Sequence, residues 1–185
     1  KTLLLSHTIF VFMKKIFGLL LGLCLLTACD DGDLVLESFN FSSATIQKCT
    51  DKTFLFKTNS DELLLVDIDE TSFLNEVTPD GEPRIVNITG TNKVLYRKYS
   101  GTVGSTTVCN DIPPATPTVV NEWNASSGGT IEIITTEKTE IDPVTSEVVL
   151  TGYNHQIKFK NIQFVSADNT FVFEEYLFGT HTTSL

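Results

Sequence analysis

Apolar residues that recur at every second position are the feature of this chain that most constrains its fold. The runs begin at Phe39, and the clearest of them lie at residues 53–56, 64–68, 85–88, 94–99 and 131–134. A β-strand places alternate side chains on opposite faces of a sheet, so this period predicts strands with one buried face. After residue 30 we find no sustained helical stripe, and residues 69–77 are expected to hold one short helical turn. The pattern therefore predicts an all-β fold.

The last third of the chain predicts an antiparallel meander. Strands are expected at residues 130–139, 147–164 and 171–178. The Asp142–Pro143 pair and the segment Ser166–Asn169 have the composition of turns and separate these strands. Short connections of this kind join strands that pair with antiparallel neighbours.

The long strand of this meander changes its inward parity. Ile157 and Phe159 share one parity, whereas Ile162 and Phe164 share the other. One uninterrupted strand cannot place both pairs on the same face of a sheet, since its side chains alternate. We therefore expect a bulge or break near residues 160–161.

Residues 100–129 differ in composition from the rest. They are rich in Gly, Pro, Ser and Thr, which predicts a loop with an edge strand at residues 118–120. About eight strands then remain for residues 34–185, which we expect to form a single domain. This number of strands favours an antiparallel β-sandwich, with a β-barrel as the alternative.

The amino-terminal segment has the features of a secretory signal peptide. The single methionine is Met13, two lysines follow it, and an apolar run occupies residues 16–28. This run is shorter than the roughly 20 residues that a membrane-spanning helix needs. We interpret residues 13–28 as a cleaved signal peptide and residues 1–12 as upstream translation.

The end of this leader, Leu26-Thr27-Ala28-Cys29, resembles the lipobox of bacterial lipoproteins. The resemblance implies diacylglycerol on the thiol of Cys29, cleavage before Cys29, and acylation of the new amino group, for example with palmitate. Several acyl chains hold a protein stably on a membrane, whereas one chain does so only marginally. The alternative is an ordinary secreted protein whose cysteine falls at this place by chance.

An acidic tether, residues 29–33, follows the cleavage site with the sequence Cys-Asp-Asp-Gly-Asp. Acidic residues behind the lipidated cysteine resemble the surface-export signal of lipoproteins in Bacteroidota-type bacteria. In enterobacterial sorting, the same Asp implies retention in the inner membrane. This start and the composition of the remaining chain resemble uncharacterised lipoproteins of flavobacterial type. We therefore expect a lipid anchor in the outer membrane of the cell envelope, and the resemblance to the export signal implies exposure at the cell surface.

The mature part of the chain is strongly acidic. The chain has 13 basic and 23 acidic residues, and three of the lysines precede Cys29, so the mature part has 10 basic residues and a net charge of −13. Binding to nucleic acid needs Lys and Arg to displace counterions from phosphates, and we expect no nucleic-acid partner. The net negative charge also disfavours broad docking on anionic lipid headgroups, which would repel it. Solubility explains the charge better than an acidic ligand-binding face.

Two cysteines, Cys49 and Cys109, lie within the expected β domain. In an exported chain they predict a disulfide, with two separate buried thiols as the alternative. A bridge across about 60 residues contributes roughly 4 kcal/mol to stability in the loop-entropy estimate.

The sequence lacks the common catalytic motifs, including the serine nucleophile elbow, the glycine-rich phosphate loop and the His-Glu-x-x-His zinc motif. His155 and His181 have no further ligand at zinc spacing, and we interpret them as surface histidines. Asp67, Asp69 and Glu70 resemble a solvated strand face more than a catalytic pair held across a cleft. We therefore expect no catalytic residue, no metal and no cofactor.

The expected function is a non-catalytic interaction or structural role at the cell envelope. The membrane is one expected partner, through lipid on Cys29, and an unknown envelope protein or glycan is the other. The alternative is a carbohydrate-binding module at the outer-membrane surface, in which Trp123 would stack on sugar rings beside an exposed Tyr. Packing of Trp123 in the core is the favoured interpretation. A third hypothesis, an unrecognised hydrolase, requires converging carboxylates or a histidine in a deep cleft.

Overall fold

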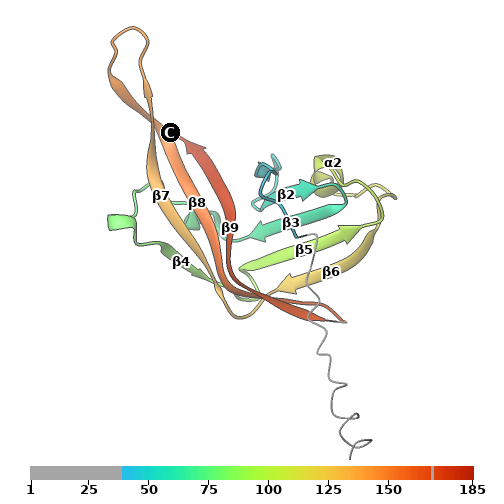
Figure 1. Ribbon diagram of the computed structural model, residues 1–185. Coiled ribbons are helices and arrows are strands. Elements are labelled where there is room, and N and C mark those ends of the chain that lie inside the picture. The colour runs from blue at the N-terminus through green and yellow to red at the C-terminus, as the bar shows by residue number, and fades with distance from the viewer. Residues whose placement is uncertain (1–38, 168) are drawn as a thin grey trace, which may run out of the picture. The chain divides into compact units, whose positions relative to one another are not determined.

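A single antiparallel sheet of nine strands makes up most of the described chain (Figure 1). The computed structural model describes residues 39–167 and 169–185, which belong to one compact unit. Predictions for the leader, the lipobox with Cys29 and the acidic tether fall outside these residues. The strands are β1 (Gln47–Lys48), β2 (Leu55–Asn59), β3 (Glu62–Asp67), β4 (Arg84–Asn87), β5 (Lys93–Tyr99), β6 (Val119–Ala125), β7 (Thr130–Ile141), β8 (Val148–Val165) and β9 (Thr170–Ser184). The helical segments are η1 (Glu70–Ser72), η2 (Pro79–Gly81) and α2 (Ser105–Cys109).

The sheet divides into two layers at a narrow junction. The strand order is β1-β2-β3-β5-β6-β8-β7-β4, and β9 pairs with the other edge of β8. Between β6 and β8, the ladder consists of one residue pair, Asn124 and Val165. Such a short ladder lets the first five strands of this order turn over the group formed by β4, β7, β8 and β9 (Figure 1). The predicted antiparallel all-β class is confirmed, and the fold is sandwich-like. The sheet stays open, so the barrel alternative is wrong.

The main core lies between these two layers. One layer contributes Leu64, Val66 and Tyr96, and the other contributes residues such as Ile131 and Phe159. Burial of each large apolar side chain stabilises the fold by about 1.5–3 kcal/mol, so this cluster holds the layers together. These residues occupy alternate positions of their strands, as the period of the sequence predicts.

A second apolar cluster covers the outer face of the first layer. It contains Leu63, Leu65 and Leu95, and α2 with its flanking loops packs over it. As a result β3 is buried on both faces, which explains its continuous run of apolar residues. The predicted disulfide between Cys49 and Cys109 is confirmed, with the two Cα atoms 5.5 Å apart. It ties the covering segment to the chain just before β2.

The change of inward parity predicted near residues 160–161 is confirmed, but β8 is not broken there: it continues to Val165, and its register shift against β9 lies between Ile157 and Lys158. Asn161 has a positive φ of 50°, and the pairing of β7 with β8 stops at Lys160. This local change of direction lets Phe159 and Ile162 both reach the core, where each is fully buried. The close approach of the neighbouring turn also requires a glycine, because a Cβ at Gly129 would lie 2.5 Å from the Asn161 carbonyl oxygen.

The loop predicted for residues 100–129 is partly wrong. Residues 119–125 form β6, which pairs with β5 along its length, and residues 105–109 form the short helix α2. Trp123 and Ala125 occupy alternate positions of β6 and are buried. Because polar residues surround them in the sequence, the alternation of a strand could not be recognised there. The single helical turn expected within residues 69–77 is confirmed as η1, whose first turn is capped by the Asp69 carboxylate.

Candidate functional site

A two-stranded arm extends from the second layer beyond the end of β9. The last residue of β9, Ser184, pairs with Gly152 of β8, and β7 and β8 continue past this point (Figure 1). We call residues 138–151 the arm. Within the described chain, no third strand accompanies it. A two-stranded ribbon without a covering layer is only marginally stable in water, so its exposed surface calls for an explanation.

The tip of the arm is fixed by a hydrogen-bonded turn. The Asp142 carboxylate accepts hydrogen bonds from the backbone N–H groups of Val144 (2.7 Å) and Thr145 (3.1 Å). These two hydrogen bonds lower the pKa of Asp142 and keep its side chain ionised. The backbone N–H of Ser146 also donates to the Asp142 carbonyl, 2.8 Å away. The arm therefore ends in a defined turn, as the Asp142–Pro143 pair predicts.

One face of the arm is aliphatic and open to solvent. Ile141 lies opposite Val148, and Thr139 lies opposite Leu150 in the same register. The side chains of Ile141 and Val148 are each 70% exposed, and Val144 at the tip is 89% exposed. Single exposed valines are common on protein surfaces, whereas an aliphatic strip on a projecting ribbon is a candidate interaction surface.

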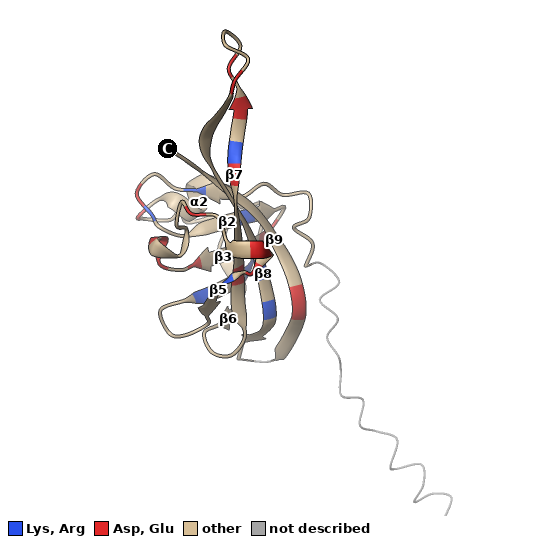
Figure 2. Ribbon diagram, turned by 90° about the vertical axis from the view of Figure 1, so that its left-hand side faces the viewer, with Lys and Arg blue, Asp and Glu red and all other residues tan. Residues whose placement is uncertain are grey.

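The charged groups of the arm are mainly acidic, and on the opposite face Glu140 lies across from Val149, which is 44% exposed. Lys138 and Glu140 form an ion pair of 3.1 Å. Asp142 and Glu147 lie at the tip, so the arm carries three acidic residues and one basic residue, a net charge of −2. Figure 2 shows charged segments along β7 where the arm leaves the body of the domain. The arm thus combines an aliphatic face with an acidic tip.

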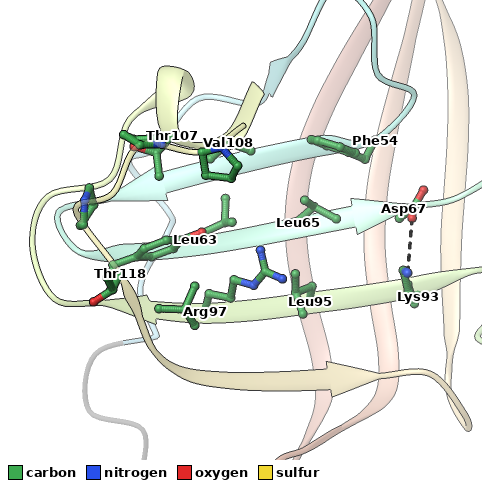
Figure 3. A pocket seen from close by; sticks show the side chains of 15 residues that line it. Phe54, Leu63, Leu65, Asp67, Lys93, Leu95, Arg97, Thr107, Val108 and Thr118 are labelled. Atoms are coloured by element: carbon green, nitrogen blue, oxygen red, sulfur yellow. Dashed lines mark ion pairs between the residues drawn. The ribbon is translucent and has the colours of Figure 1, made fainter. Parts of the chain in front are cut away.

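A groove lies on the outer face of the first layer (Figure 3). Leu63, Leu65 and Leu95 form its floor, and Val108 of α2 stands above them. Its volume is about 450 Å³, enough for a small ligand or a few side chains of a peptide. Helix α2 forms one side of the groove, and the disulfide at its last residue, Cys109, fixes its position.

The cations that line the groove are paired. The Nε atom of Arg97 lies 2.7 Å from a carboxylate oxygen of Glu122, and Lys93 faces Asp67 at 3.8 Å (Figure 3). Burial opposes the ionised state of Glu122, but hydrogen bonds from Arg97 and Asn124 outweigh it and lower the pKa of Glu122. The groove therefore presents an apolar floor without an uncompensated charge for a ligand to meet.

His155 is buried in a hydrogen-bonded network, so the prediction of a surface histidine is wrong for this residue. Its imidazole is fully buried, with Nδ1 2.9 Å from the Thr135 hydroxyl oxygen and Nε2 3.0 Å from that of Thr183. The Thr183 hydroxyl donates to the side-chain oxygen of Asn75, 2.6 Å away. It must therefore accept from Nε2–H of a neutral imidazole. Burial, with smaller effects of His181 and Arg84, lowers the pKa of His155 to about 4.

Three ionisable side chains, those of Lys57, Glu62 and Tyr96, are buried in the interior. The ammonium group of Lys57 donates to the carbonyl oxygen of Phe41 (3.1 Å) and lies 5.5 Å from the centre of the Phe178 ring. Burial lowers the pKa of Lys57. The hydroxyl of Tyr96 donates to the Glu62 carboxylate, 2.6 Å away. These contacts satisfy polar groups inside the core and bring residues 39–41 against β2.

Trp123 does not form a ligand-stacking platform, and this candidate role is wrong. Its side chain is only 6% exposed and stacks on the fully buried ring of Tyr96, with the ring centres 5.0 Å apart. The indole N–H donates to the side-chain oxygen of Asn169, 2.6 Å away. The favoured interpretation of core packing is confirmed, because both ring faces belong to the interior.

The carboxylates near the end of β3 have separate structural partners. Asp67 faces Lys93, the carboxylate of Asp69 accepts hydrogen bonds from Thr71, and Glu70 pairs with Lys48 at 2.6 Å. Among the described residues, no group of three His, Cys, Asp or Glu side chains is placed to hold a metal ion. None of the helical segments within residues 39–167 and 169–185 has the length and hydrophobicity of a membrane-spanning helix.

The projection of the arm and the network around His155 could not be predicted from the sequence. The aliphatic residues at 148–150 lie in a predicted strand, and period-two alternation normally signals burial of one face. Strand β8 extends beyond β9 because β9 ends opposite Gly152. The end of β9 is set by contacts between residues that are far apart in the sequence. The network around His155 likewise joins residues that are far apart in sequence. No protein-family model, curated protein or solved structure matches this chain.

Proposed function

We propose that this chain is a lipoprotein of the bacterial cell envelope that acts by binding another envelope molecule. In this proposal, lipid on Cys29 holds the β domain on a membrane, which we take to be the outer membrane. The support is the lipobox that ends the leader, Leu26-Thr27-Ala28-Cys29, together with the acidic residues behind it. Anchoring keeps the domain close to its partner and raises the effective concentration of the binding surface.

The exposed aliphatic side chains of the arm are the main support for a role in binding. Ile141, Val144 and Val148 remain exposed on a ribbon that leaves the body of the domain. Contact with a partner would cover these aliphatic side chains and would also support a ribbon that is marginal alone. The β domain gives the arm a rigid base, since β7 and β8 enter the core at Ile133 and Ile157.

A non-catalytic role agrees with the surroundings of the chemically capable side chains. His155 is enclosed by threonine hydroxyl groups, and the carboxylates of Asp67 and Asp69 serve in an ion pair and a helix cap. A general acid or base must reach a substrate directly or through one water molecule. Each of these groups is instead engaged in holding the fold.

Site-specific photo-crosslinking in intact cells tests the proposal. The full chain is produced with p-benzoylphenylalanine in place of Val144 at the tip of the arm. The matched control carries the same probe in place of Val172, which is 55% exposed on β9. We expect a discrete adduct of higher mass from position 144 and none from position 172. Equal labelling from both positions, or no adduct from position 144, would contradict binding through the arm.

A further inference from the structure

We infer that the arm docks into an apolar groove of a partner protein whose rim carries Lys or Arg side chains. This inference rests on the proposed function, because it specifies the partner of a binding arm. It is drawn from the division of the arm into an aliphatic face and an acidic tip. The two parts set different requirements for the partner, and one surface must meet both.

The aliphatic face requires a concave apolar surface. Val148 faces Ile141 across the ribbon, and Leu150 continues the same face toward the base. Ile141 and Val148 belong to neighbouring strands and project side by side, so a groove can cover both at once. Their high exposure leaves most of their apolar surface available for burial, which provides the main favourable free energy of association.

The charge of the arm decides between the classes of partner. Glu140, Asp142 and Glu147 outnumber the single Lys138, and the whole chain carries a net charge of −10. Docking of two copies through their arms would bring like charges together, and so would contact with anionic lipid headgroups. A rim of Lys or Arg would instead attract the tip, raise the association rate and fix the orientation of the ribbon.

The ionised carboxylates at the tip are suited to a rim of Lys or Arg side chains. Glu140 already has Lys138 as its partner, whereas Glu147 is exposed and has no ion pair within the described chain. The carboxylate of Asp142 is held ionised by the backbone of the turn. Association through these groups is expected to weaken as salt is added, because exposed charges are screened.

The experiment measures the yield of the Val144 photo-adduct in intact cells for three versions of the full chain. One is otherwise unchanged, one carries Glu140→Lys with Glu147→Lys, and the control carries Asp80→Lys with Glu82→Lys. The control reverses two exposed acids on the η2 loop and produces the same change in net charge. We expect the reversal on the arm to lower the adduct yield at least tenfold and the control reversal to leave it unchanged. Circular dichroism should show the same melting temperature for all three chains.

Mass spectrometry of the cross-linked peptide then identifies the contacted surface. A partner peptide that combines apolar residues with Lys or Arg, in an adduct that the arm reversal abolishes, supports the inference. An adduct with a second copy of this chain or with lipid overturns it, as does a yield that is indifferent to the arm reversal. The absence of any adduct from the unchanged arm would overturn the proposed function itself. The two failures are therefore distinguishable.

Discussion

The imidazole of His155 donates a hydrogen bond from Nε2 to the hydroxyl oxygen of Thr183, 3.0 Å away on the adjacent strand β9. This contact fixes the tautomer of a histidine that is buried without a carboxylate partner in the described structure. A neutral imidazole in such a site cannot accept a second proton without disturbing its neighbours. We therefore expect the base of the arm to be sensitive to acid.

The free energy of unfolding is predicted to fall as the pH is lowered from about 6.5 to about 4. The folded-state pKa of His155 is lowered to about 4, whereas the unfolded chain titrates near 6.5. The unfolded state therefore binds the proton first, and protonation favours unfolding across this window. A shift of this size corresponds to about 3 kcal/mol. Urea denaturation at several pH values measures it.

The variants His155→Gln and His181→Gln separate the two histidines. The first should lose most of the pH dependence above pH 5, whatever its stability at pH 7. The second should retain most of it, although burial also lowers the pKa of His181. An undiminished pH dependence in His155→Gln would contradict the assignment to this residue.

Removal of the disulfide is predicted to lower the free energy of unfolding by about 4 kcal/mol. The bridge spans 60 positions of the chain, so its loss frees a long loop in the unfolded state. The measurement compares urea denaturation of the oxidised chain with that of the double variant Cys49→Ser and Cys109→Ser. Reductant should shift the midpoint of the unaltered chain and leave that of the double variant in place. An unshifted midpoint after confirmed reduction would rule out a stabilising bridge.

Substitution Trp123→Ala is predicted to lower the free energy of unfolding by about 3–5 kcal/mol, because it leaves a large cavity beside Tyr96. The control Val172→Ala removes an exposed side chain from β9 and should change stability by about 0.5 kcal/mol or less. Chemical denaturation followed by circular dichroism measures both variants. If Trp123→Ala were as stable as the control, the buried position of this ring would be incorrect.

Substitution Gly152→Ala is predicted to destabilise the base of the arm by about 1–3 kcal/mol. A Cβ at this position would lie 2.1 Å from the carbonyl oxygen of Thr183, so β9 would have to move away. Hydrogen exchange should show faster exchange at the end of β9. Gly90→Ala is the matched control, since its Cβ would meet no atom within 4 Å. Similar exchange in both variants would refute the close approach.

Much of the fold can be predicted from local patterns. Alternation at Leu64 and Val66 and the change of parity between Phe159 and Ile162 depend on the period of a strand, which is a local property. The pairing of Cys49 with Cys109 follows from their being the two cysteines of the expected domain.

The parts that could not be predicted depend on distant partners. Trp123 lies in a strand whose polar residues resemble a loop, and its burial is decided by Tyr96 and Asn169. The exposure of Val148 is decided by the position at which β9 ends. His155 is buried because Thr135 and Thr183 satisfy both of its nitrogen atoms, which no spacing in the sequence reveals.

Lipid attachment at Cys29 is the central claim of the proposed function, and the mass of the native amino-terminal peptide tests it most directly. Cells are labelled with alkyne-palmitate, the membrane fraction is extracted with detergent, and the peptide is analysed by mass spectrometry. We predict an amino-terminal Cys29 with diacylglycerol and fatty acyl mass, and no palmitate label in Cys29→Ser. Recovery of the protein from an aqueous extract, with an amino terminus free of acyl mass, would contradict the account.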